Sequence, residues 1–131
     1  MAYRDVLIAG LTTALSNYSN FAVSSELPFQ SGNIPLHRKN MKRVYLDEQQ
    51  DAVTEFIPTL DNRTIYQTES TVTLYLTVDA KNEPQNLANV LTACQAAKGL
   101  IPGVVRAESA LTTEIIEDQI IYSIEYNFLT I

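Results

Sequence analysis

The sequence predicts an α+β fold, a mostly antiparallel sheet of four to five strands with two helices packed on one face. Two helix-like stretches interrupt runs that show the two-residue alternation of β-strands. With 131 residues, 46% of them hydrophobic, the chain fits a single domain, residues 1–131, with a sizeable core. One cysteine excludes an internal disulfide framework, and no apolar run approaches the roughly 20 residues of a membrane-spanning helix.

Residues 3–18 are predicted to form the first helix. Its apolar stripe, at spacings of three and four, consists of Tyr3, Leu7, Leu11, Ala14, Leu15 and Tyr18. The stripe is typical of core packing, and docking of a partner helix is the alternative. Residues 19–43 lack periodicity and are predicted to form a long loop for contacts between subunits. A loop of this length is unusual inside a compact domain unless it is functional or disordered.

Residues 44–78 are predicted to contain two or three strands. Pro58 restricts the middle of this region to a sheet edge or a bulge, because proline cannot donate a ladder hydrogen bond. The clearest strand covers residues 64–78, with alternating apolar and polar side chains. Its apolar face is formed by Val72, Leu74, Leu76 and Val78.

The second helix is predicted over residues 82–98. Asn82 is its expected N-cap, Gln85 the capping-box partner, and Gly99 the residue that ends it. The apolar stripe of this helix consists of Leu87, Val90, Leu91 and Cys94. Cys94 is interpreted as a small buried apolar group rather than a nucleophile, because the sequence offers no group to activate it.

Residues 104–131 are predicted to form an antiparallel strand pair that turns at Glu117-Asp118. The apolar face of the last strand contains Ile120, Tyr122, Ile124, Tyr126 and Phe128. A strand of about twelve residues spans about 40 Å, which is longer than most strands. This pair is therefore expected to bend or to extend past its own core.

Catalytic and metal-binding chemistry is not predicted. A single histidine and a single cysteine do not supply a zinc site. The four acidic residues at positions 47–55 lack the spacing of a calcium loop, and Glu117-Asp118 is interpreted as a turn rather than a catalytic pair. We therefore predict that the chain is not an enzyme and uses no cofactor.

A basic cluster interrupts this acidic chain, whose net charge is −6. It consists of Arg38, Lys39, Lys42 and Arg43, beside His37. Residues 1–43 hold five basic and two acidic residues, for +3, and residues 44–131 hold four basic and thirteen acidic residues, for −9. The cluster is interpreted either as a solvated loop or as a head-to-tail contact with the acidic body of an identical subunit, which closes into rings. A nucleic-acid site is disfavoured, since a broad basic face is missing.

Five stretches follow one another in an informative order: YRDVLIAGLTTAL, KRVYLDE, STVTLYLTVDA, PQNLANVLTACQAAKG and IIYSIEYNFLTI. In this organisation, over most of its length, the chain resembles the tail terminator, or tail-completion, proteins of long-tailed bacteriophages. The resemblance implies a virion subunit, assembled in the host cytoplasm, that forms a ring, usually hexameric, on the tail tube. The ring would stop tube growth, meet the head–tail connector and let DNA pass through its lumen. Another neck subunit, or a monomeric ligand-binding accessory module, is the alternative.

Overall fold

A computed structural model describes the chain over residues 3–18, 21–24, 43–58, 64–79, 81, 86–116 and 119–130. The elements are α1 (Tyr3–Ala14), β1 (Ala22–Ser24), β2 (Arg43–Leu46), β3 (Gln50–Pro58), β4 (Thr64–Asp79), α2 (Leu87–Ala96), the 3₁₀ helix η2 (Ala97–Leu100), β5 (Arg106–Ile116) and β6 (Gln119–Thr130). The described strands form one six-stranded sheet in the order β1-β2-β4-β6-β5, with β3 paired to β4 off this path. This arrangement confirms the predicted α+β fold.

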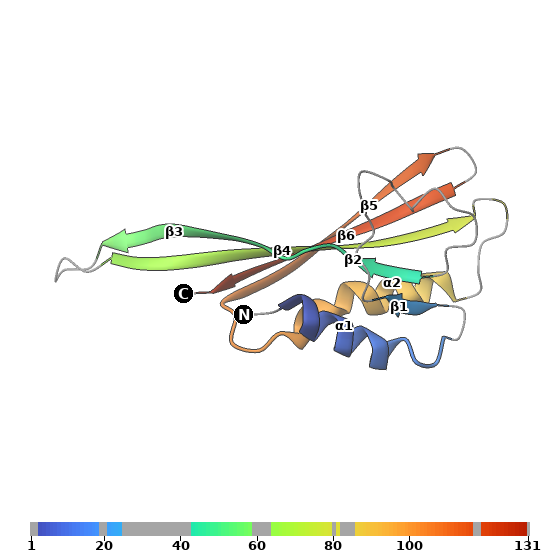
Figure 1. Cartoon of the computed structure of the whole chain (residues 1–131), viewed down its shortest axis with the longest axis horizontal. Coiled ribbons are helices and arrows are strands. Elements are labelled where there is room, and N and C mark those ends of the chain that lie inside the picture. The colour runs from blue at the N-terminus through green and yellow to red at the C-terminus, as the bar shows by residue number, and fades with distance from the viewer. Residues whose placement is uncertain are drawn as a thin grey trace.

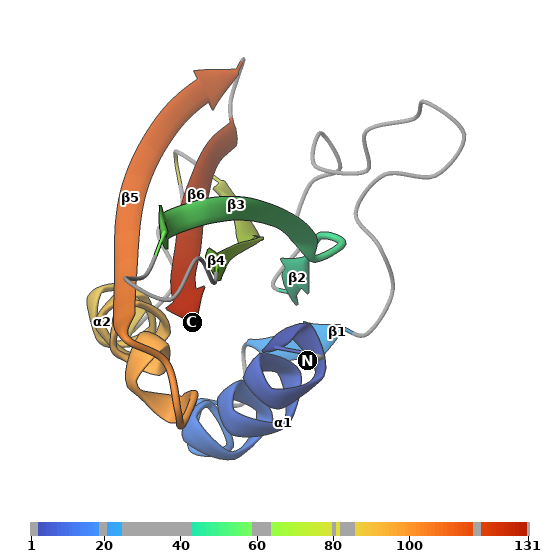
Figure 2. The ribbon, with the colours of Figure 1, turned by 90° about the vertical axis from the view of Figure 1, so that its left-hand side faces the viewer.

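The sheet is antiparallel in all its described pairings except the parallel pair of β1 and β2. Figure 1 shows α1 and α2 below the strands, and Figure 2 shows how strongly the sheet curves. The predicted strand at 64–78 is confirmed as β4, and the predicted C-terminal pair is confirmed as β5 and β6. The turn predicted at Glu117-Asp118 lies outside the described residues.

Strand β1 corrects the prediction of an uninterrupted loop over residues 19–43. Its three residues pair with β2, with Val23 opposite Val44. A stretch of three residues is too short to show a two-residue alternation, and its partner lies about twenty positions further along the chain. The pairing of β1 with β2 therefore cannot be predicted from a local sequence pattern.

Helix α1 ends at Ala14, earlier than the predicted end at residue 18. Thr12 Oγ1 donates a hydrogen bond to the Ile8 carbonyl at 2.7 Å, a side-chain bond that competes with the helical backbone pattern. Beyond the helix the chain tightens into turns, with the Tyr18 amide donating to the Leu15 carbonyl at 3.0 Å. Leu15 stays buried, so the predicted stripe continues into the turn although the helix does not.

Helix α2 begins at Leu87, so the predicted start at residue 82 is wrong. Asn86 precedes it in the left-handed conformation, with φ 66° and ψ 15°, and makes no side-chain capping bond. A residue with left-handed backbone dihedral angles cannot be part of a right-handed helix, so the helix does not extend through Asn86 toward the N-terminus. Asparagine tolerates the left-handed conformation better than most residues. The predicted capping residues Asn82 and Gln85 lie outside the described residues.

The end of α2 also differs from the prediction. The Ala97 amide is shared between two carbonyl groups of the preceding turn, and the chain tightens into η2. Gly99, the predicted stop, lies inside η2. Gly103, with φ 75°, then supplies the left-handed turn that directs the chain into β5.

One hydrophobic core joins the two helices to the sheet. The helices bury Tyr3, Leu7, Leu11, Leu87, Val90 and Cys94, together with Leu15 in the turn after α1. The sheet contributes Val72, Leu74, Leu76, Val78, Ile124, Tyr126 and Phe128 to the same cluster. The predicted apolar faces of β4 and β6 are thus confirmed, and the helix stripes, apart from the exposed Ala14, pack into the chain's own core. We call the sheet face that carries these residues the core face.

Aromatic rings and one buried hydroxyl organise the centre of this core. The Tyr126 hydroxyl donates a hydrogen bond to the Cys94 carbonyl of α2, and the Tyr3 and Phe128 rings lie 5.2 Å apart. Burial raises the pKa of the Cys94 thiol to about 12 and also raises the pKa of Tyr126. Both groups are therefore neutral at pH 7, and Cys94 is the small buried group that the sequence indicates.

The helices are too short to cover the core face along its whole length. β4 has 16 residues and spans about 50 Å. α1, with 12 residues, spans about 18 Å, and the 10 residues of α2 with the 4 of η2 span about 23 Å. Neither helix reaches half the length of β4. Figure 1 shows the result: β3 and the start of β4 extend beyond the helices.

We predict that Tyr126→Phe lowers the free energy of unfolding by about 1 kcal/mol, because it removes a buried hydrogen bond while the ring keeps its packing. Urea unfolding followed by circular dichroism measures the change. Tyr66→Phe is the matched control, since that tyrosine is 59% exposed. Equal stability of Tyr126→Phe and the unsubstituted chain would contradict the role given to this hydroxyl.

Candidate assembly surface

The residues predicted to form the contact between subunits are placed only in part. Arg38, Lys39 and Lys42 lie outside the described residues. Arg43 is the first residue of β2, where its backbone pairs with β1. None of the four side chains belongs to the described part of the chain, so their role stays a prediction.

An arm formed by β3 and residues 64–71 of β4 is the clearest candidate for an assembly surface, and its outer part is two-stranded, since β6 pairs only from residue 68 onward. β6 ends at Thr130, opposite Thr68, so residues 64–67 of β4 pair with β3 alone among the described strands. An isolated two-stranded ribbon is at best marginally stable in water. The arm therefore gains from any partner that packs against it.

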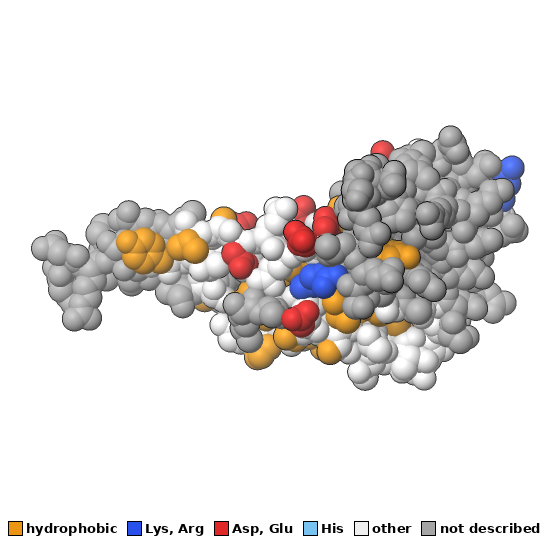
Figure 3. All heavy atoms as spheres, viewed as in Figure 1, with side chains coloured by type: hydrophobic (Ala, Val, Ile, Leu, Met, Phe, Trp, Pro, Cys, Tyr) orange, Lys and Arg blue, Asp and Glu red, His pale blue; other side chains and the backbone are white. Residues whose placement is uncertain are grey.

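Two described apolar side chains of the arm are exposed: Val53 by 65% and Tyr66 by 59%. Val53 stands opposite Thr68, and side chains two residues apart on a strand share a face. Val53 and Tyr66 therefore lie on the core face, continued beyond the helices. Figure 3 shows apolar side chains on the arm, well away from the helical end of the molecule.

A second exposed apolar stripe follows β5. Val105, just before the strand, and Leu111 and Ile115 within it are 61%, 37% and 70% exposed. The register with β6 places Leu111 and Ile115 on the core face, whereas Val105 lies in the bend just before the strand. Between them, the hydroxyl of partly buried Ser109 donates to the Gln95 carbonyl of α2 at 3.3 Å. α2 thus contacts the middle of this strand, while apolar side chains on both sides of the contact stay exposed.

Both apolar stripes lie beside open strand edges. Within the described part of the chain, β5 pairs with β6 alone and β3 pairs with β4 alone. The outer edge of such a strand presents a row of backbone N–H and C=O groups that can pair with another strand. The two ends of the sheet path from β3 to β5 are therefore both available to a partner.

The sheet face opposite the core face, which we call the outer face, is acidic. The described residues include four exposed glutamates there: Glu69, Glu108, Glu114 and Glu125. Arg106 shares this face, with its Nε 3.4 Å from Glu108 Oε1. Burial, and then the charges of Asp47 and Glu125, raise the pKa of Tyr75 on the same face. The two faces of one sheet thus differ sharply in chemistry.

Arg4, at the start of α1, fixes the segment from which the arm departs. Its Nε and Nη2 donate to the Leu46 carbonyl at 3.1 and 3.0 Å, and Nε also donates to the Asp47 carbonyl at 3.1 Å. Its backbone amide donates to Gln49 Oε1 at 3.2 Å. Sequence reasoning missed this residue, since no local pattern links it to positions more than 40 residues away.

The hydrogen bonds continue from this segment into the arm itself. Gln49 Nε2 donates to Asp51 Oδ1 at 2.9 Å. Hydrogen bonds from the side chains of Ser70 and then Gln49 lower the pKa of Asp51 below its ordinary value of 3.8. On the outer face, Asn127 Nδ2 donates to Glu69 Oε1 at 2.7 Å. These bonds join β3, β4 and β6 at the root of the arm.

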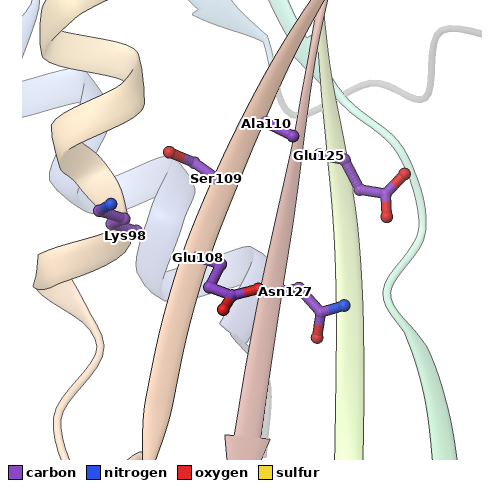
Figure 4. Close-up of a pocket in the computed structure, with 6 residues that line it drawn as sticks. All are labelled: Lys98, Glu108, Ser109, Ala110, Glu125 and Asn127. Atoms are coloured by element: carbon purple, nitrogen blue, oxygen red, sulfur yellow. The ribbon is translucent and has the colours of Figure 1, made fainter.

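A hollow of about 300 Å³ lies beside β5. It is lined by Lys98, Glu108, Ser109, Ala110, Glu125 and Asn127. Figure 4 shows that these side chains do not converge: Ser109 points toward the helices, whereas Glu125 and Asn127 point away from them. Polar groups of a ligand site converge on the ligand, so this hollow does not define one.

Other kinds of site find little support among the described residues. They contain no group of three histidine, cysteine or carboxylate side chains placed to hold a metal ion. Neither α1 nor α2 has the length and hydropathy that crossing a membrane requires. Comparison with models of known protein families finds no match, and comparison with curated proteins finds no significant match. Function is therefore inferred from this chain's own residues.

We predict that Arg4→Met lowers the free energy of unfolding by about 1–2 kcal/mol, because it removes charged hydrogen bonds to two backbone carbonyls while keeping an apolar stem. In this variant, amide hydrogen exchange at residues 47–51 should become faster under conditions in which exchange in the core is still unchanged. Lys98→Met, which removes the same charge from an exposed side chain of η2, is the control. Unchanged exchange at residues 47–51 would show that Arg4 does not hold the root of the arm.

Proposed function

We propose that this chain is a structural subunit that assembles with copies of itself into a ring, and that the ring terminates the tail tube of a long-tailed bacteriophage. The proposal rests on one observation above all, the arm with Val53 and Tyr66 exposed beyond the core. A ribbon of this kind is stabilised when its apolar face is buried against another molecule. A monomer that functions alone would gain nothing from an exposed ribbon of this kind.

The acidic outer face supports a lumen through which DNA passes. In the proposed ring the outer face lines the channel, so glutamates from every subunit meet the phosphate backbone. Like charges repel, and affinity for nucleic acid depends on cationic contacts that such a surface lacks. DNA would slide without specific binding, while the tail tube protein and the head–tail connector bind the two ends of the ring.

The alternative of a monomeric ligand-binding module requires space between α2 and the sheet. Leu87, Val90 and Cys94 occupy that region with exposures of 3%, 0% and 0%. The described residues therefore pack this interface with side chains rather than leaving a cavity. The alternative nearest to a tail terminator is another subunit of the neck, which would also form a ring. The two differ in whether the ring binds the end of the tail tube.

We predict that charge reversal at Arg38, Lys39, Lys42 and Arg43 together dissolves the ring at moderate salt, because it removes the attraction to the acidic body of the next subunit. Native mass spectrometry of the purified protein measures the particle. Reversal of the four basic residues of 44–131, Arg63, Lys81, Lys98 and Arg106, is the control, since it changes the net charge by the same amount. An unchanged particle mass after the fourfold reversal would remove the basic cluster from the contact.

We predict that the chain arrests growth of tubes assembled from the tail tube protein of the same phage. Negative-stain electron microscopy should show shorter tubes with a ring at one end, at substoichiometric amounts of the chain. Tubes of unchanged length and bare ends, in the presence of assembled rings, would favour another position in the neck.

A further inference from the structure

We propose that the subunits of this ring join by strand pairing, with the outer edge of β3 in one copy against the outer edge of β5 in the next. This inference rests on the proposed ring and specifies the surfaces that form it. β3 offers 9 residues and β5 offers 11, and within the described residues neither has a second partner. Each edge therefore presents backbone N–H and C=O groups with which the other edge can pair.

Strand direction favours this pairing. Along the path β3-β4-β6-β5 every neighbour is antiparallel, so β3 and β5 run in opposite directions within one copy. A second copy placed beside β5 in the same orientation therefore presents its β3 antiparallel to β5. The antiparallel pattern continues through the contact without turning either copy over, as a ring of identical heterologous contacts requires.

The positions of the exposed apolar side chains also favour this pairing. Val53 on β3 and Leu111 and Ile115 on β5 all lie on the core face of their own copy. Joining the two edges brings these exposed apolar groups onto one continuous face. The glutamates of the outer face then also form one continuous surface, on the side that the proposed lumen uses.

The contact also sets the inclination of the strands. β3 lies opposite residues 64–71 of β4, whereas the β5–β6 register is centred on the other end of β4, residues 69–79. Pairing β3 with the β5 of a neighbour displaces successive copies along the strands. A closed ring accommodates such a displacement by tilting its strands relative to the ring axis, as β-barrels do.

Pairing of like edges is the competing arrangement. Two β5 edges related by a twofold axis would also be antiparallel, but the contact is isologous and stops at a dimer. It would leave the arm of each copy without a partner. The two arrangements place different residues together, and this makes them separable.

The test uses Val53→Cys and Ile115→Cys in chains that also carry Cys94→Ala, with the two variants co-expressed under different affinity tags. Both sites are exposed, so neither change disturbs the core. A bis-maleimide reagent spanning about 10 Å should link the two different variants and leave each variant alone unlinked. Leu111→Cys replaces Ile115→Cys in a second mixture, because it probes the same stripe at another register.

The outcomes separate this contact from the proposed function. Linkage of Val53→Cys to either β5 variant supports the pairing. Linkage of Ile115→Cys to itself, or an intact ring by native mass spectrometry with no linkage in either mixture, overturns the pairing and leaves the ring in place. Failure to form any assembly overturns the proposed function, and the pairing falls with it.

A charge test checks the same contact without a reagent. Val53→Asp should raise the concentration at which the ring dissociates by about tenfold or more, because it places a carboxylate beside the apolar side chains of the neighbour's β5 on the same face. Gln50→Asp is the matched control, since its exposed side chain lies on the other face of β3, where it stands opposite the uncharged Thr71. Equal effects of the two variants would overturn the claim that the core face of β3 enters the contact.

Discussion

The length of the sheet relative to the helices is the constraint on which the rest of the structure depends. A strand of 16 residues is more than twice as long as either helix that packs beneath it. The helices can bury only part of the core face, where the exposure of Leu74, Tyr126 and Phe128 falls to zero. Beyond them, the same alternation of side chains leads to Val53 and Tyr66, and there the described residues supply no cover. The fold and the proposed assembly thus follow from one pattern.

The arm is held in place by the monomer. Arg4 ties α1 to the segment before β3, and Gln49, Asp51 and Ser70 extend the hydrogen bonds into the ribbon. A surface whose direction is set before association loses less conformational freedom on binding. This arrangement explains how a ribbon with little core of its own would present a defined edge and a defined face to the neighbour that we propose.

How well each element can be predicted from the sequence depends on how far apart along the chain its interacting residues lie. The alternation in β4 and β6 shows in the sequence because one face of each strand is apolar and buried, while the middle of the other face is polar. The start of α2 was predicted wrongly because the left-handed conformation of Asn86 depends on the fold around it. β1 and the contacts of Arg4 escaped prediction because their partners lie far away in sequence. The basic cluster, beyond the described residues except for the backbone of Arg43, stays a prediction.

The central claim is that the arm and the β5 edge are completed together by neighbouring copies. Hydrogen–deuterium exchange, compared between dilute monomers and the concentrated assembly, tests it most directly. Peptides covering β3 and β5 should become protected together, and over the same concentration range, while peptides from the core of β4 and α2 should change little. Protection that appears elsewhere, with both strands exchanging as fast in the assembly as in the monomer, would contradict it.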